Sequence, residues 1–501
     1  MPPPASPDSS GSQKVIARGA GSNALSFVIR FAARAGFLYV GARLYGAANY
    51  GVFTMASAMV ELAVPVASLG LKRMIFPWLE EETSATHGRL ATHVLLDALL
   101  LAMLTGLAVS LAMIGGVLLL PQGAVSEALR IAIALLAPAV LGQITGDIAL
   151  AATRWTHKMR YEVIGRGLVE PYALTGVALV AWQFGLQGTG MLLGYWAGSI
   201  ALAVFSLWSA RHCLGPLHLR RWRPSPVSLL RRARALVPAS GSDFLTTLAQ
   251  RIDLYLVGFL LGDAPAGVYG VLRQLRTPIL QVRQAFDGIL TPLTARTMRS
   301  DGDVVTGEAT AAATRVVLTL QLGVVLMIAA TGDLLLGVFG VSQPGAYTAL
   351  LAMVLAETVN GAFGVSELIL YYRRPALALQ VNLILIAVAG LGIPLLTPDY
   401  GIVGATVAML IAALFAAGLR RHWLAGLGVR PPLLHAAVPI AGASMAVIVG
   451  RQCALFLPST TAVAVRDAAP AVIALALYTA FVLIWRKLRP GVLSLNRYRI
   501  S

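Results

Sequence analysis

Long apolar segments recur along the whole chain, separated by short polar gaps. A helix needs about 20 apolar residues to cross the roughly 30 Å hydrocarbon core of a bilayer. This criterion predicts an all-α polytopic membrane protein with fourteen transmembrane helices. The predicted spans cover residues 24–44, 50–71, 94–119, 128–151, 167–184, 189–210, 236–261, 266–291, 314–340, 347–371, 375–396, 400–419, 433–456 and 468–485.

Composition supports a membrane protein and excludes the main soluble classes. Only 12% of the 501 residues are charged, against about 25% in soluble proteins, so a large core would lack a polar cover. The net charge of +17 is therefore interpreted as loop charge rather than as a nucleic-acid surface. A disulfide between Cys213 and Cys453 is not expected, because the predicted topology places them near opposite membrane faces.

The gaps predict the orientation of the chain. Lysines and arginines concentrate in the even-numbered gaps, as at Lys72, Arg166 and Arg420, whereas the odd-numbered gaps hold only Arg466. Positively charged loops remain in the cytoplasm. We therefore expect both termini in the cytoplasm, with the first span acting as an uncleaved anchor.

Two turns share one sequence pattern at a fixed distance. The turn at Leu44-Tyr45-Gly46 continues to Tyr50-Gly51-Val52-Phe53, and its counterpart at Gly262 continues to Gly267-Val268-Tyr269, 216 residues later. The same distance relates Gly185 to Gly401. Two parallel six-helix lobes are expected, of the kind that transporters use. The predicted divisions are a disordered cytoplasmic N-terminus (1–23), an N-lobe (24–210), a basic cytoplasmic linker (211–235), a C-lobe (236–424), helices 13 and 14 (433–487) and a cytoplasmic tail (488–501).

Ionisable residues inside spans point to a cavity, since charge within a membrane is costly and usually functional. Arginine keeps its charge and matches phosphate oxygens with its forked donors. The sequence therefore predicts a cationic cavity that receives an anionic group such as a pyrophosphate. The alternative is that these arginines pair with acids. The predicted cavity residues are Arg30, Arg34, Arg273, Arg276 and Arg283, and the possible coupling carboxylates are Glu61, Asp147, Asp253 and Glu367.

Three sequence features indicate a resemblance to a known family. They are the turn Leu-Tyr-Gly-x-x-x-Tyr-Gly-x-Phe after the first span, its counterpart at 260–269 and the segment Arg251-Ile252-Asp253. The chain resembles bacterial polysaccharide-unit flippases of the Wzx type, for O-antigen or exopolysaccharide. Their superfamily, the multidrug/oligosaccharidyl-lipid/polysaccharide (MOP) exporters, also holds multidrug (MATE) exporters and the lipid II flippase. The resemblance implies a V-shaped, MATE-like arrangement of about fourteen helices and alternating access. It also implies transport of an undecaprenyl-pyrophosphate-linked oligosaccharide, with membrane lipids and downstream polymerase or export proteins as partners.

Two other functions stay open at this point. One is an ion-coupled exporter of small solutes or drugs, although a cationic first span argues against cationic drugs. The other is a membrane polysaccharide polymerase or ligase, which the short outer gaps disfavour. No cofactor or metal is expected, because the sequence has neither a GxxxxGK[ST] loop nor an HExxH pair. We expect a transporter rather than an enzyme.

Overall fold

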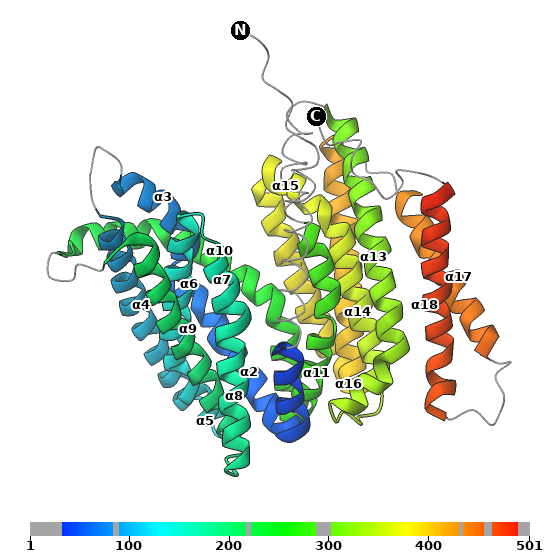
Figure 1. The fold of residues 1–501 in the computed structure, drawn as a ribbon, viewed down its shortest axis with the longest axis horizontal. Coiled ribbons are helices and arrows are strands. Elements are labelled where there is room, and N and C mark those ends of the chain that lie inside the picture. The colour runs from blue at the N-terminus through cyan, green and yellow to red at the C-terminus, as the bar shows by residue number, and fades with distance from the viewer. Residues whose placement is uncertain are drawn as a thin grey trace, which may run out of the picture. The chain divides into compact units, whose positions relative to one another are not determined.

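The protein is helical throughout the part of the chain that the structure describes. The computed structural model describes residues 33–83, 90–216, 222–286, 302–429, 434–454 and 463–488, and within these ranges it contains helices and turns but no strand (Figure 1). The prediction of an all-α membrane protein is confirmed.

Each of the fourteen predicted spans contains helical residues within the described ranges. Eleven helices there are long and apolar enough to cross a membrane. The difference has three sources. The first span is described only from Ala33. The eighth is described only to Phe286, as two short helical segments. The eleventh and twelfth run together in α16 (Pro375–Gly426). Gly401, with φ 55° and ψ −137°, turns the chain between these last two spans.

The two repeated turns have nearly the same backbone conformation. Gly46 precedes α2 with φ 83° and ψ 162°, and Gly262 precedes α11 with φ 89° and ψ −172°. Residues that have a Cβ atom rarely adopt a positive φ, so glycine is required at both positions. Gly185 and Gly401 also have positive φ, as the repeat predicts.

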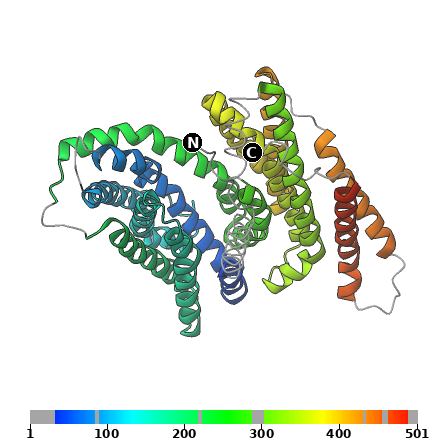
Figure 2. The ribbon, with the colours of Figure 1, turned by 45° about the horizontal axis from the view of Figure 1, so that its top comes forward.

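The chain divides into two compact units, Met1–Thr247 (unit 1) and Leu248–Ser501 (unit 2). In unit 1, α9 packs against α6 and α8, and α4 packs against α6; Figures 1 and 2 show these helices together in blue to green. The elements of unit 1 are η1 (Tyr39–Leu44), α2 (Ala47–Ala67), α3 (Leu71–Thr83), α4 (Ala91–Leu119), α5 (Glu127–Leu136), η2 (Ala137–Ala139), α6 (Val140–Trp155), α7 (Arg160–Ile164), η3 (Gly165–Val169), α8 (Glu170–Gln183) and α9 (Gly190–Leu214).

Helix α10 (Pro226–Leu261) contributes residues to both units. It begins within the predicted linker, so that residues 226–235 are helical. Its first half binds unit 1: Ser240 donates a hydrogen bond to the Pro65 carbonyl at 3.0 Å, and Arg232 pairs with Glu82. Arg232 also stacks on Trp78, with the guanidinium 4.5 Å from the ring centroid. This arginine is therefore held by α3, not directed to lipid headgroups.

In unit 2, α13 packs against α14, α17 and α18, and α14 packs against α16. Helices α17 and α18 lie side by side (Figure 1), and a core of five buried residues, including Leu326 and Tyr478, joins them to α13. The Tyr478 hydroxyl donates to the Thr319 carbonyl at 3.1 Å. Besides the second half of α10, this unit contains α11 (Asp263–Leu275), α13 (Gly302–Val338), α14 (Ala346–Phe363), η4 (Gly364–Ser366), α15 (Glu367–Arg373), α16, α17 (Leu434–Ala454) and α18 (Val463–Leu488).

Candidate functional site

The eighth span is interrupted at one of the predicted cavity arginines. Helix α11 ends at Leu275, Arg276 forms a turn, and helical backbone resumes from Thr277 to Phe286. The cause is local: Pro278 has no N–H to donate to the carbonyl four residues earlier, and its ring disfavours a continuous helix. The break places Arg276 at a helix terminus within the span, where discontinuous helices of transporters hold their ligands.

Arg273, one turn before the break, is firmly held by α10. Its guanidinium pairs with the Asp253 carboxylate and also donates to the Gln250 carbonyl at 2.8 Å. The Tyr269 hydroxyl donates to the second Asp253 oxygen at 3.0 Å, and the Asp253 side chain is only 1% exposed. Asp253 is thus fully engaged by groups of the same unit, which fixes Arg273 in place.

Arg276 is held more loosely than Arg273. Its Nη1 lies 3.4 Å from an oxygen of Glu357 on α14, and the two side chains are 17% and 11% exposed. A separation of 3.4 Å is longer than a good charge-assisted hydrogen bond of about 2.7–2.9 Å. Arg276 therefore keeps donor capacity that a stronger anionic ligand could use.

A second interrupted segment lies in the tenth span. After α14 the α-helical backbone changes to the 3-10 helix η4. At its first residue, Gly364, Nη1 of Arg283 occupies the space where the Cβ atom of a larger residue would lie. Arg420 of α16 is 3% exposed, pairs with Glu367 at 3.4 Å and donates to the Asn360 amide oxygen at 3.4 Å. Arg283 is close enough to Arg420 for mutual repulsion.

Among the described residues that interact around these two breaks, arginines outnumber carboxylates. Arg251 lies close enough to Arg273 to repel it, and Asp253 also attracts Arg276. The C-unit cationic cluster, as we call it, contains five arginines and three carboxylates. Its members are Arg251, Arg273, Arg276, Arg283, Arg420, Asp253, Glu357 and Glu367.

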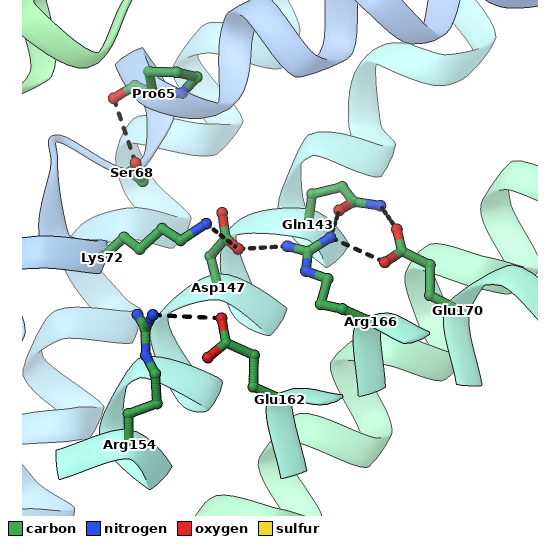
Figure 3. Close-up of polar contacts among 9 residues, drawn as sticks. All are labelled: Pro65, Ser68, Lys72, Gln143, Asp147, Arg154, Glu162, Arg166 and Glu170. Carbon is green, nitrogen blue, oxygen red and sulfur yellow. Dashed lines mark hydrogen bonds and ion pairs between the residues drawn. The ribbon is translucent and has the colours of Figure 1, made fainter. Parts of the chain in front are cut away.

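Unit 1 contains a polar network of balanced charge instead (Figure 3). Asp147 on α6 pairs with Arg166 and, at 3.2 Å, with Lys72. Arg166 also pairs with Glu170 at 3.0 Å and donates to the Gln143 amide oxygen at 2.8 Å. Two cations thus face two carboxylates, so this network joins α3, α6 and α8 without a surplus of positive charge.

Of the three remaining predicted residues, two belong to unit 1 and one lies outside the described ranges. Arg30 precedes the first described residue, and Arg34 is an exposed residue in the helical segment that leads into η1. Glu61 is half-buried on α2. A cavity that joins Arg34 to Arg276 stays a prediction.

Three cations of these clusters were assigned to loops by the sequence pattern: Arg420, Arg166 and Lys72. For one of them, the local sequence spacing does indicate an ion pair. Arg166 precedes Glu170 by one helical turn, a spacing at which opposite charges pair. Arg420 and Lys72 meet partners from distant helices, which no local spacing reveals.

The fold and the long apolar helices define a class, the helical multi-pass membrane proteins. Within it, the chain belongs to the polysaccharide biosynthesis protein family, whose model matches residues 16–298. No curated protein matches the sequence significantly.

Solved structures support the same fold. The structure of the lipid II flippase MurJ in an inward closed conformation is similar, with a TM-score of 0.71 at 12% identity over 93% of this chain and 100% of that chain. An inward-facing MATE-family multidrug transporter of the MOP superfamily gives a TM-score of 0.59 at 14% identity, over 80% of this chain and 95% of that one. The MATE multidrug transporter DinF-BH gives 0.54 at 17% identity, over 80% and 94%.

Proposed function

We propose that the protein is a flippase of the bacterial inner membrane, with both termini in the cytoplasm. It moves an undecaprenyl-pyrophosphate-linked oligosaccharide unit from the cytoplasmic to the periplasmic leaflet for polysaccharide or lipopolysaccharide export. The family supports a role in polysaccharide biosynthesis, and the fold supports transport. In the proposed cycle, the arginines of the C-unit cationic cluster become accessible first from one side of the membrane and then from the other.

The observation that carries the proposal is the position of Arg276 at the break of the eighth span. Its pairing with Glu357 at 3.4 Å is loose, whereas its planar fork suits two phosphate oxygens at once. A pyrophosphate would therefore replace Glu357 as its partner. Arg273 serves as a positioning residue, because Asp253 and Gln250 hold it.

The carboxylates fall into two groups, as the arginines do: some hold the fold together, and others pair loosely with an arginine. Asp253 is engaged by Arg273 and Tyr269, and Asp147 is engaged by Arg166 and Lys72, so we assign both to stabilising the fold. Glu357 takes the role of a charge that the substrate displaces. Glu367 plays the same part for Arg420.

Transport of a fluorescent lipid-linked oligosaccharide by the full chain in proteoliposomes tests the proposal, with a membrane-impermeant quencher reporting the outer leaflet. A charge-assisted hydrogen bond contributes about 1.5–3 kcal/mol, so Arg276→Gln should slow transport roughly ten- to a hundredfold. Glu357→Gln should retain at least the original rate, because it frees Arg276 without removing a substrate contact. Arg234→Gln, an exposed arginine on α10, is the matched control. Full transport by Arg276→Gln would contradict the mechanism.

A cellular measurement separates the functions. In cells that lack the protein, lipid-linked units should accumulate in the cytoplasmic leaflet and return to the periplasmic leaflet on re-expression. Normal exposure of these units without polymer would instead indicate a polymerase or ligase. No change in either leaflet would indicate a small-solute exporter.

A further inference from the structure

An apolar groove runs along one face of α9 in unit 1. It is a shallow, open hollow of about 670 Å³, lined by Ala197, Ile200, Ala201, Val204, Phe205 and Trp208. These positions recur every three or four residues and so share one helix face. Ile200, Val204 and Trp208 are 53%, 63% and 56% exposed, while the two alanines leave the hollow between them. In a membrane protein, such a face contacts lipid chains.

The groove ends at a cluster of aromatic rings. The Trp208 ring stacks on His212 with a centroid distance of 5.9 Å and an interplanar angle of 12°. Tyr161 meets Trp208 edge-on at 6.1 Å. Tryptophan and tyrosine concentrate at the level of the lipid headgroups, so this end of the groove lies at the membrane surface.

Exposed cations flank these rings. The Arg160 guanidinium lies 5.0 Å from the Tyr161 ring centroid and donates to the Tyr161 hydroxyl at 3.2 Å. Arg211, in the last turn of α9, is also exposed. The groove is therefore apolar along its length and positively charged at one end. This arrangement is complementary to a lipid with an anionic headgroup.

The length of the groove selects between membrane lipids. Ala197 and Trp208 are eleven residues apart, which corresponds to about 16 Å along a helix. This is roughly half of the 30 Å hydrocarbon core, the depth of one leaflet. A phospholipid acyl chain fits that depth, whereas the 55-carbon chain of an undecaprenyl carrier is much longer.

We propose that this groove binds one anionic phospholipid of the leaflet at the basic end of α9. One acyl chain lies along Ala197, Ala201 and Val204, the glycerol region contacts Trp208, and the headgroup phosphate contacts Arg160 and Arg211. The site lies in unit 1 and does not depend on the substrate that the protein transports.

Quenching of Trp208 by brominated lipids tests the site in the purified full-length protein. The protein has eight tryptophans, so the Trp208 signal is taken as the difference between the wild type and Trp208→Phe. Two arginines near a headgroup favour an anionic lipid by about thirtyfold in affinity. Brominated phosphatidylglycerol should therefore quench Trp208 at a roughly thirtyfold lower mole fraction than brominated phosphatidylcholine.

Variants divide the site into its two parts. Arg160→Gln with Arg211→Gln should remove the preference for phosphatidylglycerol, while the exposed α10 control pair Arg231→Gln with Arg234→Gln should keep it. Ala201→Phe should fill the groove and remove the saturable quenching by either lipid. Thermal unfolding identifies an Ala201→Phe protein that does not fold, in which case the arginine pair decides.

Three results would overturn the proposal. Equal quenching by both lipids in the wild type would show a face bathed in bulk lipid. Displacement by undecaprenyl phosphate at lower concentrations than by phosphatidylglycerol would assign the groove to a polyprenyl chain. Efficient crosslinking between two copies through Val204→Cys would assign it to a protein interface.

Discussion

Arg166 is the centre of the polar network of unit 1, and its replacement by methionine tests whether that network stabilises the unit. The side chain pairs with Asp147 and Glu170 and donates to Gln143 (Figure 3). Without it, Asp147, whose side chain is 10% exposed, retains only Lys72 at 3.2 Å. Glu170, at 18% exposure, retains the Gln143 amide at 2.9 Å.

The exposure of each side chain determines how much stability its replacement should remove. Removing one partner of a buried ion pair costs about 3–5 kcal/mol. The Arg166 side chain is 32% exposed, so water offsets part of this loss and we expect a value at the lower end, about 3 kcal/mol. Lys72 is 46% exposed, and Lys72→Met should therefore cost at most about 1 kcal/mol, as exposed ion pairs do.

Thermal unfolding of the purified protein in one detergent, at one scan rate, measures the difference. Arg166→Met should lower the midpoint about three times as far as Lys72→Met. The triple variant Arg166→Met, Asp147→Asn, Glu170→Gln should recover most of the loss, because it leaves no unpaired carboxylate. Equal shifts for the two single variants, or no recovery in the triple variant, would refute the assignment of a stabilising role to Arg166.

Three further variants test single contacts. Tyr478→Phe removes the hydrogen bond from α18 to the Thr319 carbonyl at 3.1 Å and should destabilise the protein by about 1 kcal/mol in the same unfolding measurement. Gly364→Val should displace the Arg283 guanidinium, which occupies the space of the new side chain, and reduce lipid-linked oligosaccharide transport more than it reduces the yield of folded protein. Trp182→Phe removes the donor, at 3.1 Å, to the last carbonyl of η1 and should cost about 1 kcal/mol, seen as a lower midpoint; an unchanged midpoint would show that water replaces the indole.

The positions of the spans could be predicted from the sequence, because hydrocarbon imposes the same requirement on every spanning helix. The turns between spans could also be predicted. Glycine favours turns with positive φ, and both Gly46 and Gly262 have a positive φ. These features depend on residues close together in the chain. The helix break at Arg276 is less predictable: Pro278 contributes to it because it has no N–H to donate, but Pro65 and Pro394 lie inside continuous helices.

The ends of the helices were harder to predict, and this error hid several charged contacts. Hydropathy marks where the apolar residues end, whereas a helix continues as long as its backbone hydrogen bonds are satisfied. Helix α16 runs to Gly426, beyond the predicted end at residue 419, so Arg420 stays in the helix and is only 3% exposed. Helix α10 begins at Pro226, before the predicted span, and thereby brings Arg232 to Glu82.

The roles of the arginines within the spans depend on partners that lie far away in the sequence. Spacing along one helix cannot distinguish Arg273 from Arg276, because Asp253 comes from α10 and Glu357 from α14. In the structure the two differ in what already occupies their donors: Arg273 is held by a buried carboxylate and a carbonyl, and Arg276 by one carboxylate at 3.4 Å. The sequence left two interpretations open, pairing with acids and lining a cavity. Arg273 pairs with an acid in the structure, and lining a cavity is the role that we propose for Arg276. In our proposal, the rigidly paired Arg273 fixes the interrupted span, and the loosely paired Arg276 beside it exchanges its carboxylate for the phosphate of a substrate.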